Sequence, residues 1–141
     1  MTHTTADALL PARFLTTIAH FITTLMVFFT KDIYVRAALP IGDSSQYASY
    51  DNSLTAALAL SWVCFAIELF GLFSGMTTFN QGAGTLYLWA HTAGIIALIF
   101  FVLEGWHYMI YWYIFTFCSA LPALIETGLL LLVTLLRVNQ Y

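Results

Sequence analysis

Long apolar segments separated by short polar ones dominate the chain. A helix needs about 20 predominantly apolar residues to cross a bilayer. The hydropathy pattern predicts four such spans, at residues 14–30, 54–73, 86–103 and 111–136. No alternation of apolar and polar residues competes with the helical interpretation. We therefore predict an all-α, integral membrane four-helix bundle in one domain, residues 1–141, with short connections and one longer first loop at residues 31–53.

The fourth apolar segment is longer than a bilayer requires. At about 1.5 Å per residue it extends roughly 39 Å, against a hydrocarbon core of ~30 Å. It contains Pro122, whose missing N–H leaves the carbonyl of Cys118 without its helical partner. This predicts a bend near residues 118–119. Glu126 lies one turn further on, and its carboxyl group is expected to face protein because contact with lipid is costly.

Composition supports the membrane class. The 141 residues are 61% hydrophobic and 8% charged, whereas about a quarter of the residues of a soluble domain are charged. The net charge of −3 and the lack of a basic cluster argue against a nucleic-acid partner. Cys64 and Cys118 form no disulfide or metal-binding pattern. No phosphate loop or nucleophile elbow is present, so we expect no enzymatic activity, catalytic residue, cofactor or small-molecule substrate.

Small and polar residues recur at helical spacing on one face of each predicted span. Residues three or four positions apart lie on the same side of a helix. The first span offers Arg13, Thr17, His20 and Thr24, and the second offers Ala57, Ser61, Cys64, Glu68, Gly71 and Gly75. The third offers His91 and Gly94, and the fourth offers Thr116, Ser119, Ala123 and Glu126. Narrow faces of this kind are typical of helices that pack closely in a membrane.

Three of the four ionisable residues within the spans are predicted to share one depth. Measured from the end of each span nearest the termini, His20 lies about 9 Å inside, and Glu68 and His91 each about 8 Å inside. Glu126 is predicted to lie deeper, about 15 Å inside residue 136. These depths predict one buried polar layer, with Glu126 about one turn further in.

The layer has two interpretations. In the first, Glu and His side chains bond one another and fix which helix faces which, which adds specificity more than stability. In the second, they form a metal site or a proton path, although no Glu-x-x-His or His-x-x-x-His spacing is present. The motif Gly71-x-x-x-Gly75 is similarly open, because it suits either packing within the bundle or docking of a second membrane protein.

Orientation does not follow from charge. Four spans place both termini on one side of the membrane. Arg13 and Arg137 then lie on that side, and Lys31 and Arg36 lie in the first loop, so the count of basic residues is equal.

Several runs of the sequence are specific enough to indicate a family. They are LPARFLTTIAHF at residues 10–21, AIELFGLFSGMTTFN at residues 66–80, AHTAG at residues 90–94 and YWYIFTFCSALPALIE at residues 111–126. Taken in this order, they resemble the transmembrane protein 107 family, small four-span proteins of the ciliary transition zone. The resemblance extends through nearly the whole chain.

The resemblance implies a non-enzymatic membrane scaffold that contributes to the gate controlling ciliary membrane-protein composition, and to cilium assembly. It implies cytosolic termini and partners among the tectonics and other membrane proteins of the Meckel-syndrome module. The alternative from another class is a metal-dependent membrane enzyme or a proton-coupled carrier using the His/Glu layer. The residues expected to matter for bundle architecture and partner docking are His20, Glu68, Gly71, Gly75, His91, Pro122 and Glu126.

Overall fold

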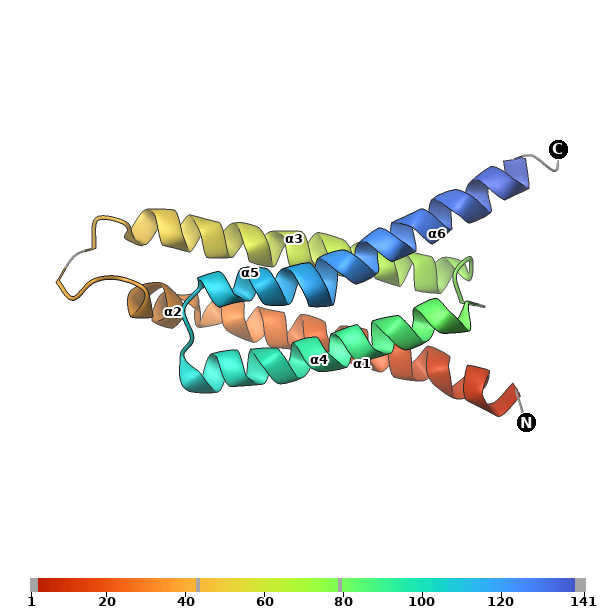
Figure 1. Cartoon of the computed structure of the whole chain (residues 1–141), viewed down its shortest axis with the longest axis horizontal. Helices are drawn as coiled ribbons and strands as arrows, with labels where there is room; N and C mark the ends of the chain where they lie inside the picture. The colour runs from red at the N-terminus through yellow and green to blue at the C-terminus, as the bar shows by residue number, and fades with distance from the viewer. Residues whose placement is uncertain (1–2, 43, 79, 139–141) are drawn as a thin grey trace.

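The computed structural model describes residues 3–42, 44–78 and 80–138, and its regular elements within these ranges are all helical. They are α1 (His3–Phe29), α2 (Lys31–Ala37), α3 (Tyr47–Ser74), α4 (Gln81–Glu104), α5 (Met109–Phe115), the π-helix η1 (Thr116–Ala120) and α6 (Leu121–Val138). Because α5, η1 and α6 follow one another without a break, they form a single rod beside α1, α3 and α4 (Figure 1). The predicted all-α four-helix bundle is confirmed.

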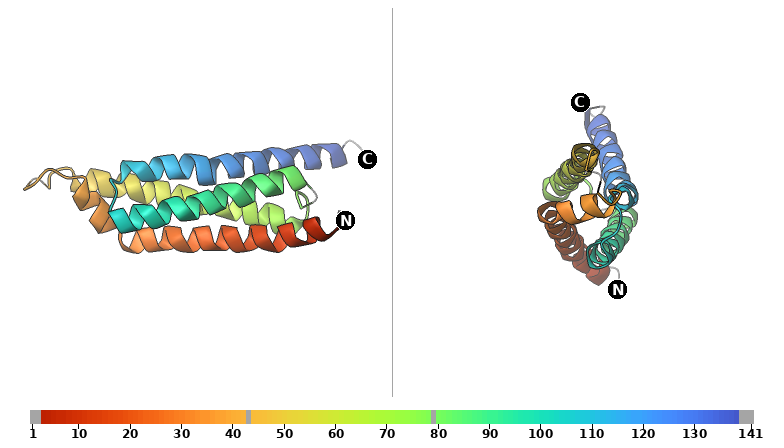
Figure 2. Two further views of the ribbon diagram at one scale, coloured as in Figure 1. Left: turned by 60° about the horizontal axis from the view of Figure 1, so that its bottom comes forward. Right: turned by 90° about the vertical axis from the view of Figure 1, so that its left-hand side faces the viewer.

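The four rods surround a common core. Helix α1 packs against α3 and α4, and the rod α5–η1–α6 packs against the same two helices from the other side. The beginning of α1 and the end of α6 lie at one end of the bundle, which we call the terminal end (Figure 1). Helix α2 lies across the opposite end, the loop end, as the end-on view in Figure 2 shows.

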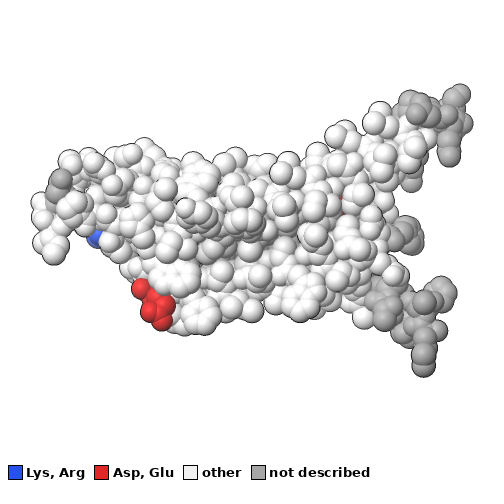
Figure 3. Space-filling view, in the orientation of Figure 1, with Lys and Arg blue, Asp and Glu red and all other residues white. Residues whose placement is uncertain are grey.

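The outer surface of the bundle suits a lipid environment. Four stretches are long and apolar enough to cross a membrane: Ala8–Phe29, Tyr47–Ser74, Gln81–Glu104 and Met109–Leu136. Large apolar side chains on all four face outward, among them Phe29, Phe73, Trp89 and Leu124. The face in Figure 3 shows almost no charged atoms between the two ends. The protein is therefore a multi-pass membrane protein with its apolar surface toward the bilayer.

The first loop is more structured than predicted, and the second long helix begins at Tyr47 rather than at residue 54. Side-chain contacts hold these extra turns although they are polar. The Tyr47 hydroxyl donates to Asp32 of α2 (2.6 Å), and Trp112 Nε1 donates to Ser53 (3.1 Å). Hydropathy alone does not detect such contacts, so the predicted boundary was wrong by two turns.

The connection between α3 and α4 is also shorter than predicted. Gly75 ends α3 with a left-handed backbone at φ +71°, a conformation that glycine adopts without the clash a Cβ would introduce. Asn80 then caps α4, its side chain accepting a hydrogen bond from the Ala83 backbone N–H (3.1 Å). This cap starts the helix at Gln81, five residues before the predicted span.

The fourth rod departs from α-helical geometry where the sequence predicts a bend. The Leu121 N–H donates to the Thr116 carbonyl, five residues back, at the end of the π-turn. Pro122 follows immediately and supplies no N–H. The turn leaves Cys118 and Ser119 buried and Thr116 exposed, so the expectation that Thr116 shares the inward face was wrong. Beyond this point α6 runs outward from the bundle in Figure 1.

The core divides into an apolar half and a polar half. At the loop end, Tyr34 and Val35 of α2 are buried and pack in one cluster with Leu98 and Phe101 of α4. The rings of Tyr34 and Phe101 lie 4.5 Å apart between centroids. Helix α2 therefore closes the loop end of the bundle with apolar side chains, and the ionisable groups of the spans are buried toward the terminal end.

Candidate functional site

The inward face of α1 carries polar residues into the bundle. Arg13, Thr17, His20 and Thr24 follow one another at steps of four, three and four, and each is buried. Both threonines donate within α1. The Thr17 hydroxyl donates to the Arg13 carbonyl one turn back, and the Thr24 hydroxyl donates to the Phe21 carbonyl. The Thr24 hydroxyl also accepts from Trp62 Nε1 of α3 (3.2 Å), and Arg13 and His20 make further contacts with other helices.

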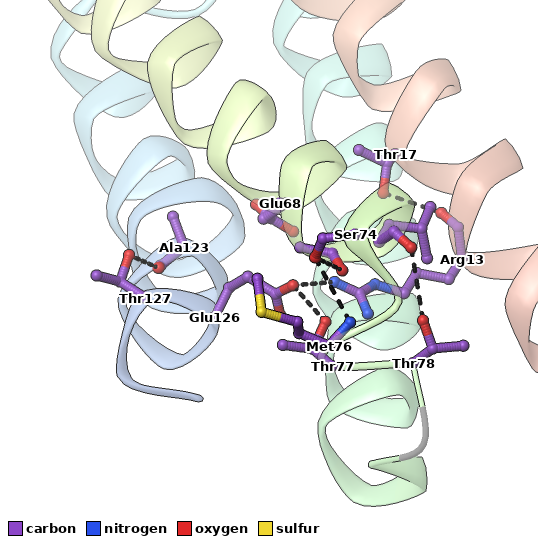
Figure 4. Close-up of polar contacts among 12 residues, drawn as sticks. Arg13, Thr17, Glu68, Ser74, Met76, Thr77, Thr78, Ala123, Glu126 and Thr127 are labelled. Carbon is purple, nitrogen blue, oxygen red and sulfur yellow. Dashed lines mark hydrogen bonds and ion pairs between the residues drawn. The ribbon is translucent and has the colours of Figure 1, made fainter. Parts of the chain in front are cut away.

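Arg13 and Glu126 form a buried ion pair between α1 and α6. Arg13 Nη2 lies 3.1 Å from Glu126 Oε1, and the two side chains are 4% and 0% exposed. The Thr77 hydroxyl, from the α3–α4 connection, donates to the same oxygen at 2.6 Å. The guanidinium carbon of Arg13 lies 4.3 Å from the centroid of the Tyr87 ring, a cation–π contact. Figure 4 shows Arg13, Thr77 and Glu126 converging from three parts of the chain.

Gly71 makes room for this pair. A Cβ at residue 71 would collide with the carboxyl group of Glu126. The small residue therefore allows α6 to bring its carboxylate against α3 and on toward Arg13. The packing interpretation of Gly71-x-x-x-Gly75 holds for Gly71 only. Gly75 ends the helix, and a Cβ there would meet no atom within 4 Å.

A second group of polar side chains joins α1, α3 and α4 one level further from the terminal end. His91 Nε2 lies 2.7 Å from Glu68 Oε2, and His91 Nδ1 lies 3.1 Å from His20 Nδ1. His20, Glu68 and His91 are all at most 1% exposed. The ring of Phe65 packs edge-on against His20 at 5.0 Å between centroids. These three polar groups form one hydrogen-bonded chain, which we call the Glu68–His91–His20 chain.

Gly94 makes room for the Glu68–His91–His20 chain, as Gly71 makes room for the ion pair. A Cβ at residue 94 would lie 2.5 Å from His20 Cε1 and 2.9 Å from Cys118 Cβ. The absence of a side chain thus allows α4, α1 and the π-turn to approach closely beside the imidazoles. Gly94 was predicted to lie on the His91 face, but its spacing gave no sign of this contact.

Three of the four ionisable residues lie at the predicted common level, but the depth predicted for Glu126 was wrong. His20, Glu68 and His91 meet at one level, as their equal depths predicted. Glu126 lies nearer the terminal end, beside Arg13, which precedes His20 by about 10 Å of helix. Its depth was counted from residue 136, but α6 continues beyond the packed part of the bundle, where Leu132 and Leu136 are more than half exposed.

Arg13 and Thr77 were not among the predicted site residues. Arg13 was treated as a charge at the membrane boundary, yet it is buried and paired. Its position on the same helix face as His20 could have indicated that it is buried. No sequence pattern indicated Thr77, because it lies in the connection between α3 and α4. Pro122 is buried two residues after the end of the π-turn, where its missing N–H accompanies the departure from α-helical geometry.

The part of the chain that the structure describes contains no cluster of metal-ligating side chains. No three or more His, Cys, Asp or Glu residues there are placed to hold a metal ion. Cys64 is half-buried and Cys118 buried, and both are free thiols. The polar contacts described above join α1, α3, α4 and α6 to one another.

Comparison with known proteins supplies the family. The family model TMEM107, described as a transmembrane protein, matches residues 9–130. The chain is 44% identical to Transmembrane protein 107 of Mus musculus over 128 residues, covering 90% of this chain and 91% of that protein. It is 40% identical to Transmembrane protein 107 of Homo sapiens over 87% of this chain and 89% of that protein. The chain belongs to the transmembrane protein 107 family.

The family match spans the whole buried polar core. Both ends of the Arg13–Glu126 pair and the complete Glu68–His91–His20 chain lie within residues 9–130. Transmembrane protein 107 of Danio rerio is 38% identical over 88% of this chain and 93% of that protein. No solved structure matches the chain.

Proposed function

We propose that this member of the transmembrane protein 107 family is a non-enzymatic scaffold in the membrane of the ciliary transition zone. In this role it contributes to the gate that controls ciliary membrane-protein composition and to cilium assembly. The observation that carries the proposal is the 40–44% identity to relatives named Transmembrane protein 107 across about nine tenths of the chain. The ciliary role itself is what the sequence resemblance implies.

The chemistry of the interior is consistent with an architectural role. The buried charged and imidazole groups contact one another across helices, and they define which helices are neighbours. Such groups select one arrangement of helices over others. A rigid bundle with an apolar exterior can then bind other few-span membrane proteins laterally, in particular tectonics and other members of the Meckel-syndrome module. From the family resemblance we also propose that both termini face the cytosol.

The test is to express a tagged copy in ciliated cells that lack their own transmembrane protein 107. We expect the tagged protein to concentrate at the base of the cilium, to restore cilium number and to co-purify with transition-zone membrane proteins. Glu104→Gln, an exposed carboxyl at the end of α4, is the matched control and should behave as the wild type. A stably folded copy that distributes over the whole plasma membrane and restores nothing would contradict the proposal.

A metal-dependent enzyme is distinguished by elemental analysis of the purified protein. The scaffold is expected to contain no stoichiometric iron or zinc. If such a metal were found and were lost on Glu68→Ala, the enzyme would replace the scaffold as the better explanation.

A further inference from the structure

The Glu68–His91–His20 chain has a property that helix packing does not require. Its two hydrogen bonds connect three titratable groups from three helices in a line, through both nitrogens of His91. Each bond needs one donor and one acceptor, and a neutral imidazole has one of each. The donor and acceptor roles along the line are therefore linked, and they depend on how many protons the three groups hold together.

The charges around this chain limit that number. The titratable and charged groups that face it come from the elements packed around it: Arg13 and His20 of α1, Cys64 and Glu68 of α3, Tyr87 and His91 of α4, Cys118 of η1 and Glu126 of α6. The positive charge of Arg13 is balanced by Glu126 at 3.1 Å. Glu68 is then the one carboxyl group of the set without a cation of its own.

An unbalanced charge at this position is expensive. Glu68 and His91 are 1% and 0% exposed inside a bundle that lipid surrounds. Burial of a lone carboxylate in such surroundings is costly, and the group ordinarily gains a proton instead. Among the described residues, Oε1 of Glu68 and Oε2 of Glu126 are both buried without a hydrogen-bond partner, but Glu126 has the Arg13 guanidinium beside it and Glu68 has no such permanent cation.

We propose that Glu68, His91 and His20 form a binding site for one proton, which they hold as a unit so that the buried core is electrically neutral. This proposal rests on the contacts among these three side chains and does not depend on the proposed ciliary function. The proton lies on the hydrogen bond between Glu68 and His91, either on the carboxyl oxygen or on His91 Nε2. In both cases the chain as a whole carries no net charge.

The proton sets the tautomer of His20. With the proton bound, His91 donates from Nδ1, so His20 Nδ1 is the acceptor and His20 keeps its hydrogen on Nε2. Without it, Glu68 is a carboxylate that accepts from His91 Nε2, and His91 Nδ1 carries no hydrogen. His20 must then donate from Nδ1 across the same 3.1 Å contact. Release of the bound proton from the site thus moves the hydrogen of His20 from Nε2 to Nδ1.

The test is solid-state NMR of the full chain with ¹⁵N-labelled histidine, reconstituted in bilayers at neutral pH. We expect His20 to carry its hydrogen on Nε2, with Nδ1 as an acceptor, and His91 to be protonated on Nδ1. The variant His107→Gln removes an exposed histidine outside the bundle and identifies its signals without touching the site. His20 protonated on Nδ1 beside an unprotonated His91 Nδ1 would overturn the proposal.

A second measurement uses the stability of Glu68→Gln. Gln has the shape and zero charge of the protonated carboxyl and can donate to His91 Nε2. We therefore expect the ratio of folded to unfolded protein to change by less than about ten-fold, as for the exposed control Glu104→Gln. If the site instead lacks this proton and the fold depends on a Glu68 carboxylate beside a neutral His91, the ratio falls by about a hundred-fold or more, and the proposal fails.

Discussion

Removal of the charge on Glu126 isolates the energy of the buried ion pair. In Glu126→Gln the side chain keeps its size, and its amide oxygen still accepts from the Thr77 hydroxyl. What disappears is the counter-charge of Arg13, which is 4% exposed and 3.1 Å away. An arginine cannot shed its proton at neutral pH, so its charge stays buried without compensation.

The size of the effect follows from the geometry. Two unit charges 3.1 Å apart attract by about 5 kcal/mol at an effective dielectric constant of about 20. Breaking a buried pair by removing one partner costs about 3–5 kcal/mol. We expect Glu126→Gln to lower the free energy of unfolding by that amount, which is a large share of the stability of a small domain.

The double variant Arg13→Met/Glu126→Gln is the matched control. It carries the same glutamine but no buried cation, and methionine fills irregular space well. Replacing both members of a buried pair by neutral residues is often close to neutral. We therefore expect the double variant to recover most of the lost stability, to within about 1 kcal/mol of the wild type.

The assay is reversible unfolding in mixed micelles by increasing the fraction of SDS, followed by circular dichroism and tryptophan fluorescence. A single variant within about 1 kcal/mol of the wild type would show that the pair is not buried as described. A double variant no more stable than the single variant would show that the loss does not come from an uncompensated Arg13.

Two further predictions concern close packing and the loop end. Gly94→Ala places a Cβ 2.5 Å from His20 Cε1 and should destabilise the protein by about 1–3 kcal/mol in the same assay. Gly128→Ala, with open space around it in α6, should stabilise by about 0.5–1 kcal/mol, and equal effects would contradict the packing. Hydrogen bonds from Arg36 and Tyr47 lower the pKa of Asp32, so this contact stabilises above the unfolded-state pKa and is lost as pH falls through the folded-state pKa. The protection factors of the α2 amides, which are the intrinsic exchange rates divided by the observed rates at the same pH, should fall on acidification in the wild type, and in Asp32→Asn they should be low at every pH.

The sequence specified the architecture because apolar length and helical spacing are local properties. Four apolar segments predicted four rods, and steps of three and four residues predicted which polar residues face inward. His20, Glu68 and His91 were placed at one level because their spans end close to the same membrane boundary. Pro122 indicated the irregular turn before it for an equally local reason, its missing N–H.

The errors arose where a distant contact decides the structure. Glu126 was placed too deep because α6 extends beyond its neighbours, and the sequence does not show where the packed part of the bundle ends. From the sequence, Arg13 resembles a charge at the membrane boundary. Only the fold shows that Glu126, 113 residues later, lies beside it. The early start of α3 depends on Tyr47 and on a tryptophan in α5. Each case is a tertiary contact that outweighs a local preference.

The most direct test is the separation of Glu68 and His91 in a bilayer. Dipolar recoupling between ¹³C in the Glu68 carboxyl group and ¹⁵N at His91 Nε2 reports it, with Glu68→Gln identifying the signal. We predict the strong coupling expected for the 2.7 Å contact between Nε2 and Oε2. No coupling in a folded, bilayer-embedded protein would mean that these groups do not meet, and the buried polar core described here would be wrong.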